Sequence, residues 1–416
     1  MEPADIPKII SEIDLHGMRK WLIKALTQSF REARKNKLGT FNEHRYDERW
    51  EENVIRLTNA VMEHYYEPSA SISFVIYDPM IREIFAAPFV DRVVHHFLYK
   101  MQGGWWDRRF IADSYSCREK KGTLYGIYRA QRMMQQVSNN FTEPAYIIKL
   151  DIRGYFMSLP REKLYERVRW GLYRQFKPYF QYSSAYELYK VCCFLWRQIL
   201  FDDPVKKSRR RGTIRDWKVL PPEKSLYTQP PGRGIVIGNL TSQLVSNIYL
   251  DQLDRFIKYH LGYQYYGRYV DDFFILVPES QYKAAKTDVQ KIEHFLKDEL
   301  GLTLHPKKRY YQSIYKGMSF LGARIYPRCL YPSNRLQKKF KRALSKLNTG
   351  QIRDEAVISY FGYMRHIDAD KYVERLFDKY GLDFNLFLES KIPDRRSLNE
   401  IMRDLKSGDR TVARRG

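Results

Sequence analysis

Cysteine is scarce in this sequence, and long apolar runs are missing from it. The four cysteines among 416 residues form no CxxC pair and have no histidine at zinc-ligand spacing. We therefore expect free thiols in a reducing compartment and no structural zinc. No apolar run approaches the roughly 20 residues that a membrane-spanning helix needs, which excludes a helical membrane protein.

Acidic residues are also in deficit. The 48 Asp and Glu face 72 Lys and Arg, so the formal net charge is +24, well beyond what solubility requires. Because the basic residues are spread along the whole chain, nucleic acid is the expected partner and a membrane surface is not. The N-terminus, MEPADIPKII, is acidic where a secretory signal is basic and then apolar, so we expect a cytoplasmic protein.

The chain is long enough to fold as two or more subdomains, and its hydrophobic periodicity predicts both helices and strands. Helices are expected over residues 15–66, 81–94, 161–201, 242–259 and 336–347. Strands are expected over residues 71–76, 146–150 and 263–277. The Arg- and Pro-rich stretch 206–231 indicates an exposed linker, and the basic helical pattern after residue 327 predicts a separate helical lobe.

Three acidic residues stand out by their positions. Asp151 ends the apolar segment YIIKL, and Asp271 and Asp272 separate two predicted strands. Taken singly, each is ordinary, because acids at strand ends commonly cap helices or form turns. Taken together, carboxylates on neighbouring strand ends can hold two Mg²⁺ ions about 3.5–4 Å apart, which activates an attacking hydroxyl and stabilises a leaving pyrophosphate.

Five ordered segments resemble the palm motifs of reverse transcriptases: IIKLDIRGYF, PPGRGIVIGNLTSQLVSNIYLDQLD, RYVDDFFIL, GLTLHPKKRYY and GMSFLGARIY. SYFGYMRHIDADKY is similar to the thumb of that family, and the resemblance extends over residues 78–380. Within the family, IGNLTSQ resembles the enzymes of diversity-generating retroelements. Most relatives, group II intron enzymes included, have QGxxxSP at that place.

The resemblance implies an α+β right-hand polymerase with fingers, a palm containing an antiparallel sheet, and a helical thumb. The implied boundaries are an N-terminal helical extension over residues 1–70, fingers over 71–145, a palm over 146–327 with an insertion over about 165–230, a thumb over 328–386 and a basic tail over 387–416.

The resemblance also implies the catalytic residues. Asp151, Asp271 and Asp272 match the acids that bind two Mg²⁺ ions, with the main chain of Ile152 as a further ligand. Lys308 matches the lysine that protonates or holds the departing pyrophosphate. Lys307 is the adjacent alternative.

Further residues resemble those that bind the nucleotide. Arg118 and Lys121 match basic residues that contact the triphosphate, although a solvated basic loop has the same composition. Phe156 is similar to the aromatic that excludes a 2′-hydroxyl, and a core aromatic would look alike. The loop around the nascent pair corresponds to Ile237, Gly238, Ser242 and Gln243, of which Gln243 is equally consistent with a polar residue in a first helical turn.

The remaining correspondences concern nucleic acid and partners. The primer grip of the family resembles Phe320, Leu321 and Gly322, although a plain strand would look similar. The basic residues expected to bind the phosphates of the RNA–DNA duplex are Lys338, Lys339, Lys341 and Arg342. The resemblance implies template RNA, deoxynucleoside triphosphates and a small basic accessory variability protein as partners, adenine-specific copying errors, and a bacterial, archaeal or phage origin. Two alternatives remain. The first is a group II intron or defence-associated reverse transcriptase, and IGNLTSQ and the lack of a zinc- or His-rich tail argue against the intron form. The second is an RNA-binding relative that has lost catalysis, which the presence of all three acids disfavours.

Overall fold

The computed structural model describes residues 4–35, 46–77, 80–349, 354–364, 366–367 and 369–384. The chain divides into two compact units. The first comprises Met1–Gly122, Lys149–Ile275 and Ala284–Tyr310, and the second comprises Thr123–Ile148, Leu276–Lys283 and Tyr311–Gly416. The predicted tail over residues 387–416 lies outside the described residues.

The N-terminal segment forms separate helices rather than the single helical stretch expected over residues 15–66. These helices are α1 (Ile6–His16), α2 (Met18–Arg34) and α4 (Trp50–Met62). Gly17 ends α1 because it adopts a φ of +82°, outside the helical region. The predicted apolar face of α2 is buried, and its Trp21 ring meets Phe97 of α5 (Phe89–Asp107) edge to face, with centroids 6.3 Å apart.

A small sheet follows. Strands β1 (Ile72–Ile76) and β2 (Arg82–Ala86) pair antiparallel, and the short β4 (Arg209–Arg210) joins β1 in parallel, giving the order β2-β1-β4. The helix expected over residues 81–94 is therefore wrong in its first part, because Glu83 and Phe85 alternate inward with half-exposed neighbours, as in a strand. The helix α5 begins only after Pro88.

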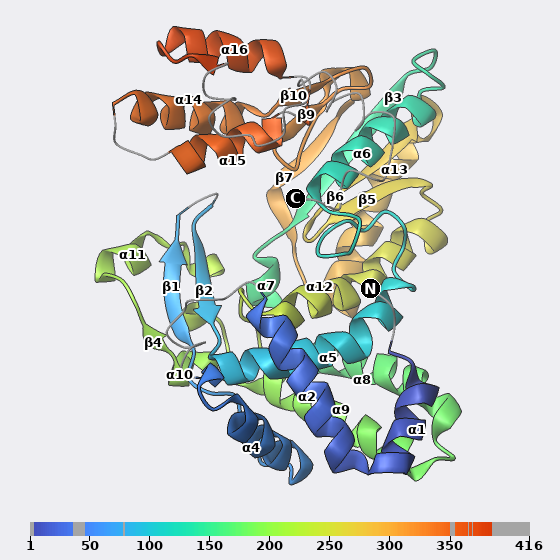
Figure 1. The fold of residues 1–416 in the computed structure, drawn as a ribbon. Helices are drawn as coiled ribbons and strands as arrows, with labels where there is room; N and C mark the ends of the chain where they lie inside the picture. The colour runs from blue at the N-terminus through green and yellow to red at the C-terminus, as the bar shows by residue number, and fades with distance from the viewer. Residues whose placement is uncertain are drawn as a thin grey trace. The chain divides into compact units, whose positions relative to one another are not determined.

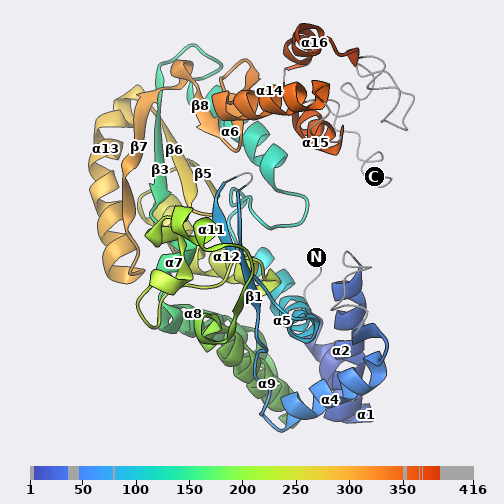
Figure 2. The same ribbon diagram turned by 90° about the vertical axis from the view of Figure 1, so that its left-hand side faces the viewer.

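Four long helices pack together in the first unit: α5, α8 (Arg161–Phe176), α9 (Ser183–Phe201) and α12 (Leu240–Arg255). Figures 1 and 2 show them lying against one another. Their close approach requires Gly171, because a Cβ there would lie 2.4 Å from Cζ2 of the buried Trp106. The predicted helical pattern over residues 161–201 is thus confirmed, with a break at η1 (Lys177–Tyr179).

The central sheet has four strands in the order β5-β6-β3-β7. They are β5 (Tyr265–Tyr269), β6 (Asp272–Pro278), β3 (Ala145–Ile152) and β7 (Leu304–Ser313). The apolar run FFILV of β6 is fully buried, which confirms the strands predicted on both sides of Asp271 and Asp272. The residues of β3, β6 and β7 nearest these acids, within 149–152, 272–275 and 304–310, belong to the first unit.

Several short elements and one longer helix complete the first unit and its links. They are α7 (Tyr155–Ser158), α10 (Pro204–Lys207), α11 (Ile214–Val219), η2 (Pro222–Lys224), η3 (Leu226–Thr228), η4 (Phe256–His260), α13 (Glu279–His294) and η5 (Phe295–Glu299). The expected linker over residues 206–231 therefore contains three short helices and the strand β4, because Leu226 and other apolar side chains anchor it.

The second unit contains α6 (Thr123–Val137), η6 (Ile314–Lys316) and a three-stranded antiparallel sheet of β8 (Met318–Phe320), β9 (Ala323–Ile325) and β10 (Leu330–Pro332). Helices α14 (Asn334–Asn348), α15 (Asp354–Met364) and α16 (Asp370–Lys379) follow. Phe340 and Leu344 of α14 are buried, so the predicted apolar face of this helix is confirmed. In the described ranges, no helix has the length and apolarity to cross a membrane.

Candidate active site

Three carboxylates gather at one end of the central sheet. Asp151 lies at the end of β3, Asp272 begins β6, and Asp271 lies in the two-residue loop between β5 and β6. Because β6 and β3 are neighbours, this loop reaches β3, and the Ile152 amide donates a hydrogen bond of 3.1 Å to the Asp271 carbonyl. Asp151 and Asp271, which are 120 positions apart in the sequence, therefore lie at the same end of the sheet.

Two lysines accompany these acids. Lys308, on β7, lies beside β3, and its Nζ is 2.9 Å from each carboxylate oxygen of Asp151. Lys149 forms an ion pair with Asp272. Sequence reasoning missed Lys149, although its position two residues before Asp151 on the same strand places both side chains on one face of the sheet.

The pKa values of Asp271 and Asp272 both lie above their ordinary range. Burial, followed by the charges of Asp151 and Asp272, raises the pKa of Asp271 to about 7. Burial also raises the pKa of Asp272, although Lys149 opposes the shift. Burial is the larger cause, and repulsion between the carboxylates adds to it. Two lysines face three carboxylates, so one negative charge stays unbalanced, and bound cations would relieve this condition.

The donor set fits Mg²⁺ only with help from a substrate. Among the residues that the structure describes, no three His, Cys, Asp or Glu side chains converge closely enough to hold a metal ion by themselves. Mg²⁺ is usually held by one or two carboxylates together with water and substrate phosphates, so this finding is compatible with it. The hard oxygen donors and the unbalanced negative charge therefore suit a divalent cation that enters with a nucleotide.

Phe156 lies on α7, directly after the acid-bearing strand. Gly154 adopts a φ of +54° and turns the chain into this short helix. Phe156 is half-buried, and the centroid of its ring lies 5.4 Å from the centroid of the Tyr155 ring. The backbone carbonyl of Phe156 accepts a 2.9 Å hydrogen bond from the Ile235 amide. This bond ties α7 to the loop that carries Ile237 and Gly238.

That loop is packed against β2. The Ile237 side chain packs on a buried cluster of Phe85, Met157 and Leu226, and its carbonyl accepts a 3.0 Å hydrogen bond from the Phe85 amide. Gly238 has a φ of +126°, and a Cβ there would lie 2.9 Å from the Phe85 carbonyl oxygen. The glycine is therefore required for its backbone conformation and for close contact with β2.

The following helix, α12, carries the two other residues of this predicted group. Ser242 is buried, whereas Gln243 is exposed and its carbonyl accepts a 2.8 Å hydrogen bond from Ser246. Gln243 thus lies in the first turn of a helix, as one of the two sequence interpretations requires.

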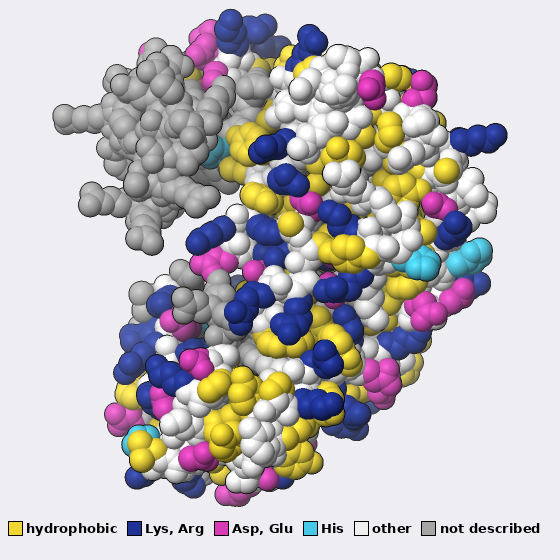
Figure 3. Space-filling view, turned by 90° about the vertical axis from the view of Figure 1, so that its right-hand side faces the viewer, with side chains coloured by type: hydrophobic (Ala, Val, Ile, Leu, Met, Phe, Trp, Pro, Cys, Tyr) yellow, Lys and Arg dark blue, Asp and Glu magenta, His cyan; other side chains and the backbone are white. Residues whose placement is uncertain are grey.

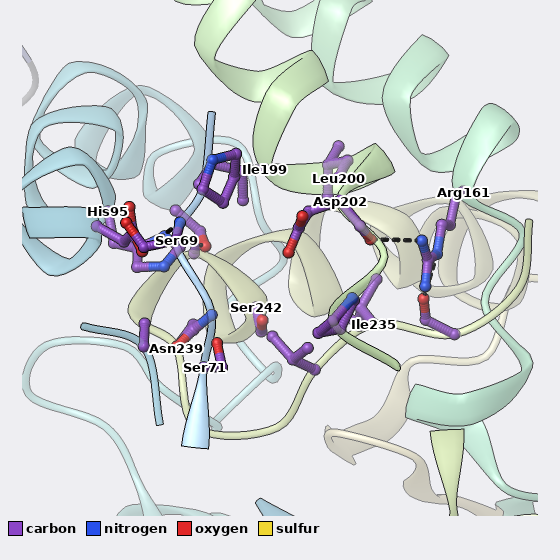
Figure 4. Close-up of a pocket in the computed structure, with 17 residues that line it drawn as sticks. Ser69, Ser71, His95, Arg161, Ile199, Leu200, Asp202, Ile235, Asn239 and Ser242 are labelled. Carbon is purple, nitrogen blue, oxygen red and sulfur yellow. Dashed lines mark hydrogen bonds between the residues drawn. The ribbon is translucent and has the colours of Figure 1, made fainter. Parts of the chain in front are cut away.

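A small cavity lies behind the loop (Figure 4). It measures about 40 Å³, and residues on its wall include Arg161, Asp202 and Ser242. Arg161 spans part of the wall, donating 2.7 Å hydrogen bonds to the carbonyls of Gly234 and Asp202. Because a water needs roughly 10–15 Å³ on this measure, the cavity has room for a few waters but not for a nucleotide.

Arg118 is engaged by its own loop. Its side chain is 6% exposed. It donates to the Asp107 carboxylate at 2.5 Å and to the carbonyls of Asp107, Ile111 and Ser114 at 2.8, 2.7 and 3.1 Å. Lys121 likewise donates to the Ala112 carbonyl. A triphosphate contact by Arg118 would require several of these bonds to break.

The predicted primer-grip residues belong to the second unit, in the hairpin between β8 and β9. Leu321 and Gly322 form its two-residue turn with φ values of +53° and +85°, as a type I′ turn requires. Tyr363 donates a hydrogen bond to the Leu321 carbonyl. The turn is therefore held from outside, which offsets the cost of placing leucine at positive φ.

The predicted duplex-binding residues lie on α14 of the second unit. Lys338, Lys341 and Arg342 are exposed, and Lys339 is half-buried. Elsewhere, Lys and Arg side chains are scattered among apolar ones over the face seen in Figure 3 rather than gathered in a single patch. This distribution agrees with the even spread of basic residues in the sequence.

A buried ion pair near the acids was not anticipated. Arg268 on β5 and Asp254 on α12 are both fully buried, with Nε and Oδ1 2.6 Å apart. The only sequence signal is a charged residue within an otherwise apolar and aromatic strand, YYGRY. Its partner was unpredictable, because apolar periodicity identifies the buried face of a helix but not which acid lies on it.

Comparison with known proteins identifies the family. The family model described as reverse transcriptase (RNA-dependent DNA polymerase) matches residues 89–325, more than half of the chain. The chain belongs to the reverse transcriptase family, and its fold is the α+β fold of that family.

Solved structures of telomerase resemble the chain more distantly. The telomerase of Candida albicans, solved with a fragment of telomeric RNA, is 11% identical with a TM-score of 0.41, and the match covers 88% of this chain. The apo telomerase of Candida tropicalis is 12% identical with a TM-score of 0.44 and 82% coverage. The chain spans 62% of the length of each of these two proteins. A search of curated proteins finds no match.

Proposed function

We propose that this protein is an RNA-directed DNA polymerase, which adds deoxynucleotides to a primer 3′-hydroxyl. The observation that carries the proposal is the meeting of Asp151, Asp271 and Asp272 at one end of the sheet, with a raised pKa at Asp271, in a chain of the reverse transcriptase family. Three clustered carboxylates with too little counter-charge suit a reaction in which cations and phosphates arrive together.

Asp151 and Asp271 would hold the metal ions, with Asp272 and the main chain of Ile152 close by. When bound, two Mg²⁺ ions would supply electrostatic stabilisation to the attacking and leaving oxygens. Lys308 pairs with Asp151 in the structure and is half-exposed, so its ammonium is free to turn toward a departing pyrophosphate once cations replace it. Lys149 is more deeply buried and would keep Asp272 in place.

The remaining predicted roles extend this proposal along the chain. The parts of such a polymerase would be an N-terminal extension over residues 1–70, fingers over 71–145, a palm over 146–327 and a thumb over 328–386. The exposed basic face of α14 would bind the RNA–DNA duplex through its phosphates, independently of sequence. Phe320, Leu321 and Gly322 would position the primer end through their held turn.

Primer extension tests the proposed activity directly. Purified protein, an RNA template annealed to a DNA primer, Mg²⁺ and the four deoxynucleoside triphosphates should give products longer than the primer. A DNA template of the same sequence serves as comparison, and omission of metal serves as control. The proposal is wrong if the primer stays unextended with Mg²⁺ and with Mn²⁺.

Phe156→Val should admit ribonucleotides. A smaller side chain removes the steric objection to a 2′-hydroxyl, so we expect kcat/KM for ribonucleotides to rise by about 10-fold or more, within the roughly 1–3 kcal/mol that a small group contributes to discrimination. Competing incorporation of CTP and dCTP measures the ratio. Phe156→Tyr, which preserves the ring, is the matched control. Retained deoxynucleotide activity with unchanged exclusion of ribonucleotides would assign Phe156 to packing alone.

We further propose that the enzyme belongs to a diversity-generating retroelement, copies a template-repeat RNA and miscopies template adenine. The support for copying errors is IGNLTSQ, in which Ile237 replaces the glutamine that most relatives carry; that the errors fall at adenine rests on the family resemblance alone. An aliphatic side chain offers no hydrogen bond to the nascent pair, and discrimination by shape alone is weak. A small basic accessory protein and variable-repeat DNA would be partners of such an enzyme.

Sequencing of cDNA from a defined template should show errors concentrated at adenines, and Ile237→Gln should lower them several-fold. Because Ile237 packs on Phe85, Met157 and Leu226, the substitution also places an amide in an apolar cluster. Ile237→Leu keeps the apolar character and should retain the wild-type error spectrum. Equal wild-type errors at all four template bases would refute the subfamily assignment.

A further inference from the structure

The residue before Asp271 has an unusual backbone conformation. Val270 adopts a φ of +56° in the two-residue loop between β5 and β6. A β-branched residue at positive φ is rare, because its Cβ substituents crowd the neighbouring peptide groups. With Val270 first in the loop, this φ has the sign of a type II′ turn, in which glycine normally occupies that position.

Both peptide groups of Val270 are held by buried side chains. The Val270 amide donates a 3.2 Å hydrogen bond to Oγ of Ser116, and the Val270 carbonyl accepts a 3.0 Å hydrogen bond from Arg268. Ser116 comes from the loop after α5, and Arg268 from β5. These two bonds constrain the backbone on both sides of the valine, and so they oppose its relaxation to negative φ.

Ser116 and Arg268 are themselves fixed by α12. Oδ1 of Asn247 accepts hydrogen bonds of 3.2 Å from both side chains, and its Nδ2 donates to the Ser116 carbonyl at 2.8 Å. Arg268 also makes two charged hydrogen bonds to Asp254, at 2.6 and 2.7 Å. We call Ser116, Asn247, Asp254 and Arg268 the buried polar network.

A contribution to folding stability does not by itself explain the buried polar network. Burial disfavours the Arg268 cation, but the charge and hydrogen bonds of Asp254, with smaller contributions from Tyr266 and Tyr155, outweigh it together, so the pKa of Arg268 lies above its ordinary value and the charge persists. A buried ion pair is often no more stabilising than apolar side chains of similar volume. What apolar side chains cannot do is bind the two peptide groups of one strained residue.

We propose that the buried polar network acts as a positioning device, which holds Val270 at positive φ and thereby fixes the Asp271 carboxylate relative to Asp151. The inference rests on the proposed polymerase function. The members of the buried polar network are positioning residues. In the described structure we observe no hydrogen bond or ion pair between any of them and the carboxylates of Asp151, Asp271 and Asp272. Small displacements of a reacting group are costly, since about 1 Å can reduce rate 10²-fold.

A double-mutant cycle tests the proposal. Ser116→Ala removes the acceptor for the Val270 amide, and kcat for single-nucleotide addition should fall about 10-fold while KM for the nucleotide changes less than twofold. Val270→Gly removes the crowding at positive φ. In the Ser116→Ala background it should restore activity to within about threefold of wild type, because glycine adopts this φ without restraint.

Hydrogen exchange of the peptide spanning residues 265–274 provides a readout besides activity. Ser116→Ala should speed exchange there without a matching increase across α8 and α9. If Ser116→Ala does not fold, Arg268→Lys replaces it in the cycle, because lysine keeps the charge but lacks the guanidinium Nη1 that donates to the Val270 carbonyl.

The outcomes separate this inference from the proposed function. An unextended primer with wild-type protein overturns the polymerase assignment, and hydrogen exchange then decides whether the buried polar network restrains the loop. With an active wild type, losses from Ser116→Ala and Val270→Gly that multiply rather than cancel overturn the inference. Unchanged exchange in residues 265–274 overturns it as well.

Discussion

Replacing Asp271 with asparagine should abolish nucleotide addition, lowering the single-turnover rate by about 10³-fold or more. The substitution preserves side-chain volume but removes a negative charge from the site that would bind the metal ions, whose electrostatic stabilisation accounts for several kcal/mol of the barrier. Rapid-quench primer extension with saturating Mg²⁺ measures the rate. RNA binding should change little, because it depends on contacts with phosphates elsewhere.

The fold should tolerate this substitution. Asp271 is half-buried near Asp151 and Asp272, and partial burial together with their charges raises its pKa, so its charge is disfavoured in the folded state. Removing that charge should therefore leave the thermal midpoint unchanged or raise it, as expected where function opposes stability. Asp298→Asn, at an exposed position in η5, is the matched control and should retain full activity. Near-wild-type extension by Asp271→Asn would remove this residue from the site.

Asp254→Asn should destabilise the protein by about 3–5 kcal/mol, because it leaves the fully buried Arg268 without its counter-charge. Asp254 also accepts a 2.6 Å hydrogen bond from the buried Tyr266 hydroxyl, so two partners are affected at once. The midpoint of urea unfolding should shift strongly at an unchanged slope.

A surface ion pair supplies the comparison. Lys24 and Glu12 are 3.0 Å apart with side chains 72% and 29% exposed, and breaking this pair by Glu12→Gln should cost about 0–1 kcal/mol. A cost for Asp254→Asn as small as that for Glu12→Gln would contradict the view that the Arg268 charge depends on a single carboxylate.

Prediction from the sequence succeeded where periodicity or ordered motifs carry the information. The buried face of α14 through Phe340 and Leu344 follows from a period of 3.6 residues. The strands around Asp271 and Asp272 follow from compact apolar runs, and their junction with Asp151 follows from motif order. It failed for residues 81–87, because five residues of β2 alternate in burial and then lead directly into a helix.

The sequence by itself therefore determined the family, most of the elements and the strand ends on which the three acids lie, since these depend on local patterns and on their order. Only the tertiary structure decided which side chains meet. It paired Lys308 with Asp151 and Lys149 with Asp272, directed Arg118 into its own loop, and placed Arg268 against Asp254. The physical reason is that hydrogen bonds and ion pairs between distant segments depend on how helices and sheets pack, and a strand or helix period specifies which face is buried but not its partner.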